Sequence, residues 1–247
     1  MDVGQGDAIL IRTPAGHKIL VDGGPSGEAI TTALGRQLPF WDRHLHMVVL
    51  THPQADHLSG LLAVLERYRV DQVLASPAVV ESDLFQQWQE AVAEGRVPYQ
   101  VAARGQWLDL GDDAWLSVLH PPSATFTDAD VNNSSVVVKL RWRHIGFILT
   151  GDVEAEAEAL LTDAADVRAT VLKVAHHGSA TSTTPTFLRA VRPLVAVISV
   201  GADNRFGHPS PQVLERLEDA FLVRTDDNGD VHVSTDGRRL WVEVQRR

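Results

Sequence analysis

Short hydrophobic runs alternate with longer amphipathic stretches along most of this chain. Runs of four or five apolar residues predict strands, and apolar residues spaced by three and four positions predict helices. In the first half the pattern predicts strands over 8–12, 18–22, 47–50 and 72–75, and helices over 28–37, 58–68 and 81–93. A second half begins near Trp107, with strands over 115–119, 135–142, 146–149, 170–174 and 195–200, helices over 155–162, 185–191 and 211–220, and a hairpin through 231–233 and 240–244.

Both halves therefore combine strand pairs with β-α units. Two mixed sheets, each covered by helices on its outer face, would bury this set of elements. We accordingly predict an α/β fold. The strand ends then converge along one edge, where loop residues from both halves can meet.

Composition and charge narrow the possible functions. The chain has 247 residues, of which 44% are hydrophobic and 22% charged, as in an ordinary globular protein. It contains no apolar run near the roughly 20 residues that a membrane-spanning helix needs. The absence of cysteine excludes disulfides and thiolate metal sites. A net charge of −10 argues against a broad nucleic-acid-binding surface, so any phosphate binding is expected in one local groove.

The strand predicted over 47–50 is followed directly by two imidazoles and a carboxylate, His52, Asp56 and His57. A strand-to-helix turn projects such side chains outward while its flanking elements hold the backbone. Imidazole and carboxylate are ligands for Zn²⁺, Mn²⁺ or iron, so this turn predicts a metal site. The alternative is that Asp56 caps the next helix and both histidines are solvated.

Two further strand ends carry similar residues. Asp152 follows the strand over 146–149, where it could bridge two metals or cap the next helix. His176 and His177 follow the strand over 170–174, and Gly178 allows close backbone approach. Adjacent histidines point in different directions, so one is expected to bind metal and the other to face substrate. A purely structural His-His-Gly turn is the alternative.

Weaker candidates lie in other loops. Arg205 and His208 precede a helix start at Ser210-Pro211, and they could bind phosphate, donate a proton or simply form a turn. Asp22 could support a metal-binding histidine from behind or belong to a tight turn. The remaining candidates are the adjacent amides Asn132 and Asn133, which could supply ligands or hold neighbouring loops, and His120 at a strand end.

Together these residues resemble the metallo-β-lactamase superfamily, whose metal-binding signature is H-x-H-x-D-H. More narrowly, the chain resembles the C-terminal metallo-β-lactamase-like domain of the ComEC family of competence channel proteins. The matching stretches are 2–7, 21–24, 51–60, 149–152, 172–179 and 207–209, in family order. The resemblance implies a four-layer αββα sandwich over residues 1–247, forming one domain taken from a longer membrane protein.

The resemblance also implies a set of metal ligands. His52 and Gln54 would serve one divalent ion. The second would be held by Asp56, His57 and His177, with Asp152 bridging, and the roles of His176 and His177 could be reversed. Two departures from the superfamily pattern weaken the first position. Gln54 replaces a histidine, and no Gly-His motif stands between Leu58 and Asp152, where Asn132 and Asn133 are nearest. We therefore expect one or two ions, Mn²⁺ or Zn²⁺.

The function that the resemblance implies is hydrolysis of DNA during uptake, with single-stranded DNA as the expected substrate. The domain would act on the outer side of the cytoplasmic membrane, beside the remainder of a membrane channel. Asp56, His176 and His208 are the expected catalytic residues. The expected substrate contacts are Lys173, Ser179, Arg205 and Asn133. The alternatives are a hydrolase of small or cell-wall phosphodiesters and a non-catalytic domain that binds DNA or docks onto a channel.

Overall fold

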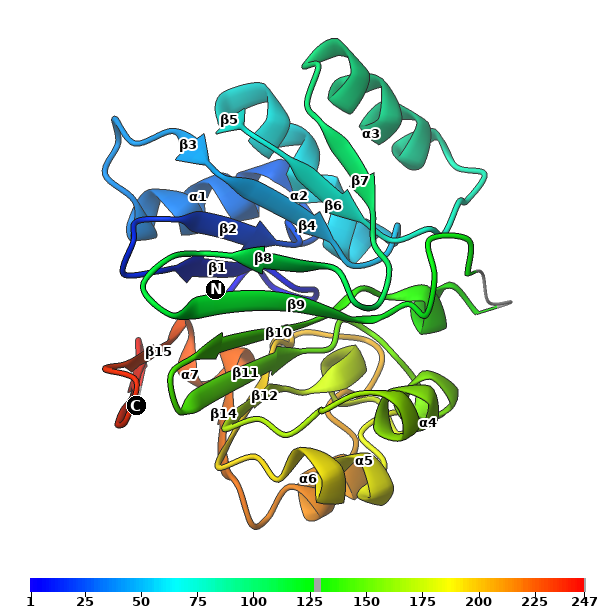
Figure 1. Ribbon diagram of the computed structural model, residues 1–247, viewed down its shortest axis with the longest axis vertical. Coiled ribbons are helices and arrows are strands. Elements are labelled where there is room, and N and C mark those ends of the chain that lie inside the picture. Colours follow the sequence, from blue (N-terminus) through cyan, green and yellow to red (C-terminus); the bar gives the residue numbers. More distant parts are fainter. Residues whose placement is uncertain (127–129, 247) are drawn as a thin grey trace.

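The chain folds into two facing β-sheets with helices on the outer side of each, so that four layers are stacked (Figure 1). The computed structural model describes residues 1–126 and 130–246. In the first sheet β1 is antiparallel to β2, and the other neighbours are parallel. Its strand order is β1 (Ile9–Arg12), β2 (Lys18–Val21), β4 (Met47–Leu50), β6 (Val73–Ala75) and β7 (Tyr99–Val101).

The second sheet is larger and mixed. Its four parallel strands are β11 (Ile145–Leu149), β12 (Val171–Lys173), β13 (Val195–Ile198) and β14 (Phe221–Arg224). An antiparallel extension continues from β11 through β10 (Val137–Trp142) and β9 (Ala114–His120) to the edge strand β8 (Trp107–Asp109). A short two-stranded sheet pairs β3 (His44–Leu45) with β5 (Arg69–Val70).

The hydrophobic core lies in three layers because the central strands of both sheets are buried on both faces. β4 shows the reason: its four residues are all apolar, as expected for a parallel strand covered on both sides. Val48 and Leu50 pack toward the helices, whereas Met47 and Val49 pack toward the second sheet. The outer helices are α1 (Gly27–Gln37), α2 (Ala55–Arg67) and α3 (Asp83–Glu94) on the first sheet, and α4 (Ala155–Ala164), α5 (Pro185–Val191) and α6 (Pro211–Arg216) on the second.

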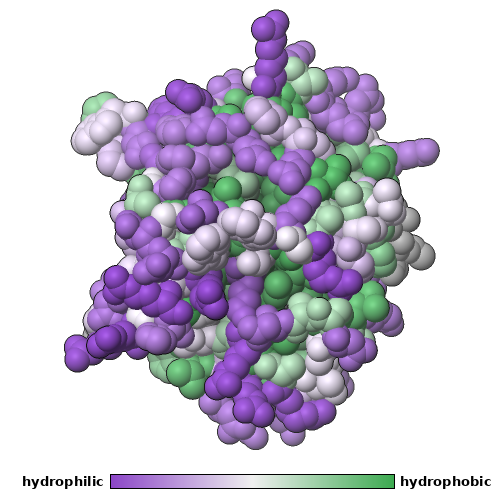
Figure 2. Space-filling view, in the orientation of Figure 1, coloured by the Kyte–Doolittle hydropathy of each residue, from purple (hydrophilic) through white to green (hydrophobic). Residues whose placement is uncertain are grey.

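The C-terminal hairpin covers the part of the second sheet that the first sheet does not cover. Its strands are β15 (Val231–Thr235) and β16 (Leu240–Val244), and α7 (Thr225–Asn228) leads into it. Val231, Val233 and Val242 pack with Val171 and Val195 of the parallel strands. The visible face is largely hydrophilic, with separate hydrophobic patches between the polar side chains (Figure 2). No helix in the described ranges has the length and hydrophobicity needed to cross a membrane.

The predicted α/β sandwich is confirmed, and most elements lie where the hydrophobic pattern predicts them. α2 differs from the predicted helix, because it begins at Ala55 and not at position 58. Asp56 and His57 are therefore in its first turn. Strands β3, β5, β7, β8 and β14 were not predicted. They are short and, apart from β14, lie outside the long apolar runs, so their sequences carry little periodic signal.

Candidate metal centre

The candidate site lies at one edge of the sandwich, where strands of both sheets end. β2 leads into Asp22 and β4 into His52, both from the first sheet. From the second sheet, β11 leads into Asp152 and β12 into the short 3₁₀ turn Ala175–Gly178, which carries His177. Parallel strands bring their carboxyl ends to the same edge, so residues far apart in sequence become neighbours.

The first turn of α2 supplies two more side chains. Gln54 is the N-cap residue, although its side chain makes no capping hydrogen bond. The alternative in which Asp56 caps this helix is therefore wrong; its carboxylate instead lies 3.3 Å from Nε2 of His177. The corresponding alternative for Asp152 is also wrong, because Glu154 is the N-cap residue of α4.

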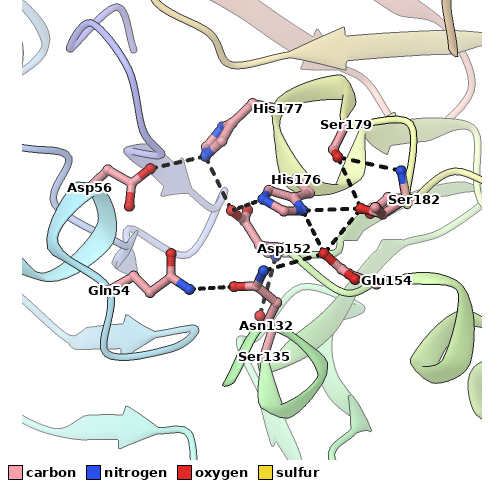
Figure 3. A network of polar contacts seen from close by, with 12 residues as sticks. Gln54, Asp56, Asn132, Ser135, Asp152, Glu154, His176, His177, Ser179 and Ser182 are labelled. Carbon is pink, nitrogen blue, oxygen red and sulfur yellow. Dashed lines mark hydrogen bonds and ion pairs between the residues drawn. The ribbon is translucent and has the colours of Figure 1, made fainter. Parts of the chain in front are cut away.

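Imidazole nitrogens and carboxylate oxygens converge at the centre (Figure 3). Oδ2 of Asp152 lies 3.2 Å from Nε2 of His177 and 3.3 Å from Nε2 of His57. Ligand atoms of Asp56, His57 and His177 all lie within 4.8 Å of one another, and so do those of His52, His57 and Asp152. Asp152 and His57 thus stand between two groups of ligand atoms, in the bridging place predicted for Asp152.

Several of these atoms are buried without a hydrogen-bond partner in the described structure. They include Nε2 of His52, His57 and His177 and Oδ1 of Asp152. Leaving a buried polar atom unpaired costs about 1–3 kcal/mol, and more for a charged group. Three imidazole nitrogens that make no hydrogen bond and lie near carboxylates are a suitable ligand set for a divalent metal. The residues present therefore fit the metal that the sequence predicts.

Hydrogen bonds behind the imidazoles fix which nitrogen faces the centre. Nδ1 of His57 lies 2.8 Å from Oδ2 of Asp22, whose other oxygen accepts the backbone N–H of Thr51. Nδ1 of His177 lies 2.8 Å from the carbonyl oxygen of Ser199. Both rings therefore turn Nε2 inward, as in metal sites where a carboxylate or carbonyl orients the ligating histidine. Asp22 lies where the sequence predicts it, behind a histidine of the site.

A buried lysine offsets part of the negative charge. Nζ of Lys173 lies 2.5 Å from Asp7 and 3.7 Å from Asp152, and it donates to the carbonyl oxygen of Gly151. Burial opposes the charged ammonium, but the carboxylates of Asp7 and Asp152 prevail and raise the pKa of Lys173. The sequence placed Lys173 at the edge of a substrate groove, and that prediction is wrong: the side chain is 3% exposed and holds carboxylates together.

The protonation pattern follows from burial and from these pairs. Burial lowers the pKa of His52 to about 3, which leaves the imidazole neutral and able to ligate. Burial also opposes a proton on His177, but Asp152 and Asp56 prevail and raise its pKa to about 9. Burial would raise the pKa of Asp56, whereas the neighbouring imidazoles of His177 and His57 lower it to about 2. Without metal, the proton on His177 supplies positive charge beside the carboxylates of Asp152 and Asp56, where the metal would otherwise supply it.

The turn that carries the paired histidines has an unusual backbone. His176, His177 and Gly178 have φ values of 49°, 52° and 84°, all in the left-handed region. Such conformations in residues other than glycine are uncommon and cost about 1–3 kcal/mol each. The two rings lie in different places: the His177 ring is buried at the centre, while His176 faces the adjoining pocket and its Nδ1 lies 3.1 Å from Glu154.

That pocket opens directly onto the centre and has a volume of about 460 Å³. Arg205 and His208 line it, and their contact with substrate stays a prediction. The ring centroids of His208 and His176 lie 5.7 Å apart. Burial, together with the charges of His176 and His177, lowers the pKa of His208. The predicted capping role of this segment is also present, since Ser210 accepts from the N–H of Val213. The complete lining comprises Gln5, Pro25, Gln54, Ala55, Asp56, Asp152, His176, His177, Asp203, Asn204, Arg205, Phe206 and His208.

Two predicted substrate contacts lie outside the pocket. Ser179 is buried and lies 2.9 Å from the hydroxyl of Thr181, and Asn133 accepts the backbone N–H of Glu154. Both hold loops together, so their assignment as substrate contacts is wrong. His120 is likewise buried, with Nε2 2.8 Å from the carbonyl oxygen of Asn133.

The predicted weak ligand Gln54 faces the site beside Asn132. Its Nε2 donates to Oδ1 of Asn132 over 2.6 Å, so two neutral amides stand together (Figure 3). This hydrogen bond uses the amide nitrogen and leaves the carbonyl oxygen of Gln54 as its potential metal ligand. Its role as a ligand stays a prediction.

Sequence reasoning missed Asp7, which is buried between Lys173 and His177. The sequence feature that could have identified Asp7 is the neighbouring Gly6. A Cβ on Gly6 would lie 2.1 Å from the carbonyl oxygen of Asp56. Only glycine allows this segment to pack against the first turn of α2. Glu154 and Asp203 were missed as well, and their local sequences give no sign of a role.

Comparison with known proteins agrees with this geometry. The family model of the metallo-beta-lactamase superfamily matches residues 1–202, and the chain belongs to that superfamily. Solved structures share the fold at low identity. YhfI from Bacillus subtilis aligns over 97% of this chain and 92% of its own, with a TM-score of 0.59 and 12% identity. Zn²⁺-bound PqqB from Methylobacterium extorquens aligns over 89% and 85%, with a TM-score of 0.58 and 13% identity.

Curated relatives point to a narrower group, the competence proteins. ComE operon protein 3 of Bacillus subtilis is 30% identical over 94% of this chain, and Recombination protein 2 of Haemophilus influenzae is 32% identical over 100%. Competence protein ComA of Neisseria gonorrhoeae is 29% identical over 92%. The chain spans 32%, 30% and 30% of the length of these relatives. It is therefore a metallo-β-lactamase-fold hydrolase related to competence proteins.

Proposed function

We propose that this chain is a metal-dependent phosphodiesterase that hydrolyses single-stranded DNA. The observation that carries the proposal is the group formed by the half-buried Asp56 and the buried His57, Asp152 and His177. This group opens onto a pocket lined by imidazoles and a guanidinium. We further propose that the chain is one domain of a longer membrane protein for DNA uptake and acts on the outer side of the cytoplasmic membrane. The names and lengths of the competence relatives support a longer protein for DNA uptake.

The residues divide into those that hold metal and those that contact the substrate. Asp56, His57, Asp152 and His177 would hold one divalent ion, and His52 with the carbonyl oxygen of Gln54 would contribute to a second. A bound ion supplies water activation and neutralises charge on the phosphate. Because carboxylate and amide oxygens suit harder ions, we propose Mn²⁺ in preference to Zn²⁺.

The pocket residues act on the phosphodiester itself. The Arg205 guanidinium lies at the pocket wall and would pair with a nonbridging phosphate oxygen. Glu154 contacts Nδ1 of His176, which leaves Nε2 to donate a proton to the departing oxygen. The lowered pKa of His208 favours its neutral form, so its expected role is to accept a hydrogen bond from the substrate or from water.

Asp56→Ala and Asp152→Ala test the proposal. We expect each substitution to abolish Mn²⁺-dependent cleavage of a labelled single-stranded oligonucleotide and to remove Mn²⁺ binding measured by calorimetry. Asp163→Ala, on the exposed side of α4, is the matched control and should keep both properties. Full cleavage by both site variants would overturn the proposal. Cleavage of a small chromogenic phosphodiester without cleavage of DNA would favour the small-substrate alternative, and DNA binding without any hydrolysis would favour a non-catalytic domain.

A further inference from the structure

A second pocket lies on the outer face of the antiparallel strands β8, β9 and β10, separate from the metal centre. Its volume is about 430 Å³. Helices α4, α5 and α6 cover the parallel strands of this sheet, and α4 also reaches the end of β9 (Figure 1). The end of α4 forms one wall, through Ala164, Ala165 and Asp166. The outer face of these strands is therefore open beside the helical layer.

Strand register explains which side chains reach this pocket. Successive residues of a strand point to opposite faces, and Leu116 and Val138 pack between the two sheets. Trp115 and Ser117 on β9 therefore point outward, as do Lys139 and Arg141 on β10. The pairings place Ser117 beside both Trp107 and Lys139, and Trp115 beside Arg141. Aromatic and basic side chains thus share one continuous face.

The two tryptophans form an aromatic surface that the protein core does not use. Trp107 is 65% exposed, and its ring centroid lies 5.1 Å from that of Trp115. Exposing indole rings costs hydrophobic stabilisation, so a pair of them beside a pocket indicates a binding surface. Nucleobases stack on such rings whatever their identity, because every base has a π face.

The charge of this pocket is opposite to that of the whole chain. Its lining contains the cations Arg104, Lys139 and Arg141 against the carboxylate of Asp166, whereas the chain has 22 basic and 32 acidic residues. Lys139 is paired with Asp166 at 2.9 Å. Arg104 and Arg141 are exposed, and neither guanidinium has an ion pair or hydrogen bond within residues 1–126 and 130–246. Two exposed guanidinium groups therefore flank the tryptophans.

We propose that this face, defined by Arg104, Trp107, Trp115 and Arg141, binds single-stranded DNA outside the metal centre. The proposal rests on the proposed function for its ligand. Bases would stack on the indole rings while phosphates pair with the two guanidinium groups, the combination typical of single-strand binding grooves. Such a surface would hold a long strand without affecting the hydrolysis of a small phosphodiester.

Fluorescence anisotropy of a labelled 20-mer oligothymidine, measured in EDTA so that no cleavage occurs, tests the proposal. We expect Trp115→Ala to weaken binding about tenfold without changing the salt dependence. Arg104→Gln and Arg141→Gln should each weaken binding and reduce the slope of log K against log salt concentration by about 0.7, the value for one phosphate contact on a single strand. A general folding defect would not weaken binding at an unchanged salt slope in Trp115→Ala and with a reduced salt slope in the two arginine variants.

Trp241→Ala and Arg238→Gln are the matched controls, because both residues are exposed on the C-terminal hairpin. They should bind the oligonucleotide like the parent chain. Equal binding by the three pocket variants, or no binding by the parent chain, would overturn the proposal. Asp152→Ala should lose cleavage and keep binding, so failure of the nuclease proposal and failure of this one give different results.

Discussion

Lys173 is the residue on which the charge balance of the metal centre depends. Its ammonium is buried between Asp7 and Asp152, and the charges on those carboxylates raise its pKa despite the burial. Buried ion pairs contribute little net stability when complete, because desolvation offsets their attraction. Removing one partner is different, since the remaining charges then stay buried without compensation.

We therefore predict that Lys173→Met lowers the free energy of unfolding by about 3–5 kcal/mol without metal. Added Mn²⁺ should restore more stability to this variant than to the parent chain, because the ion replaces the missing positive charge. Urea unfolding with EDTA or with Mn²⁺ measures both effects. Lys139→Met is the control: its partner Asp166 is 82% exposed, so the loss there should stay below about 1 kcal/mol. Equal losses in the two variants would contradict the prediction.

At the scale of elements, the 3₁₀ turn Ala175–Gly178 converts the end of a strand into a ligand site. Left-handed backbone at His176 and His177 sends one ring into the centre and the other toward the pocket. Gly178 completes this path and packs closely against Pro209 from the loop that carries His208. The two loops are therefore positioned by each other as well as by their strands.

Gly178→Ala should disturb this contact, because a Cβ there would lie 2.6 Å from Cβ of Pro209 at a φ of 84°. We predict a loss of about 1–3 kcal/mol in unfolding free energy and weaker Mn²⁺ binding. Gly35→Ala on α1 is the control, since no atom lies within 4 Å of its Cβ position. That helix should gain about 0.5–1 kcal/mol. Thermal unfolding and calorimetry measure these changes, and unchanged metal affinity in Gly178→Ala would refute the coupling.

At the scale of the whole molecule, Asp230 connects parts of the chain that are distant in sequence. Its carboxylate accepts from the guanidinium of Arg36 on α1 and from the backbone N–H of Asp2, while its own backbone begins the C-terminal hairpin. Burial opposes the charged form, but the hydrogen bonds from Arg36 and Asp2 lower the pKa of Asp230. The first residues, α1 and the hairpin are thereby held together.

A carboxyl group whose pKa is lowered on folding contributes stability above its ordinary pKa and loses it as the pH falls. We predict that Asp230→Asn lowers the unfolding free energy by about 1.5–3 kcal/mol at pH 7. The difference from the parent chain should narrow as the pH falls below about 4. Urea unfolding at a series of pH values measures it, with Asp163→Asn as an exposed control. A difference independent of pH would contradict the assigned role.

Much of this molecule follows from local sequence. Apolar runs such as Met47–Leu50 require burial, and the spacing in α2 requires one apolar face, so elements and layers are predictable from chemistry that acts over a few residues. The imidazoles and carboxylates at His52, Asp56, Asp152 and His177 are visible for the same reason, because each follows an apolar run.

The contacts that those side chains make depend on the tertiary structure alone. Lys173 belongs to a strand end like its neighbours, yet its side chain is buried against Asp7, about 166 positions earlier in the sequence. Which of the rings of His176 and His177 is buried at the centre depends on backbone angles set by packing. The aromatic face on β8–β10 depends on strand register. Local pattern determines which residues are buried or exposed, whereas electrostatic pairing and shared surfaces depend on contacts between segments that only folding brings together.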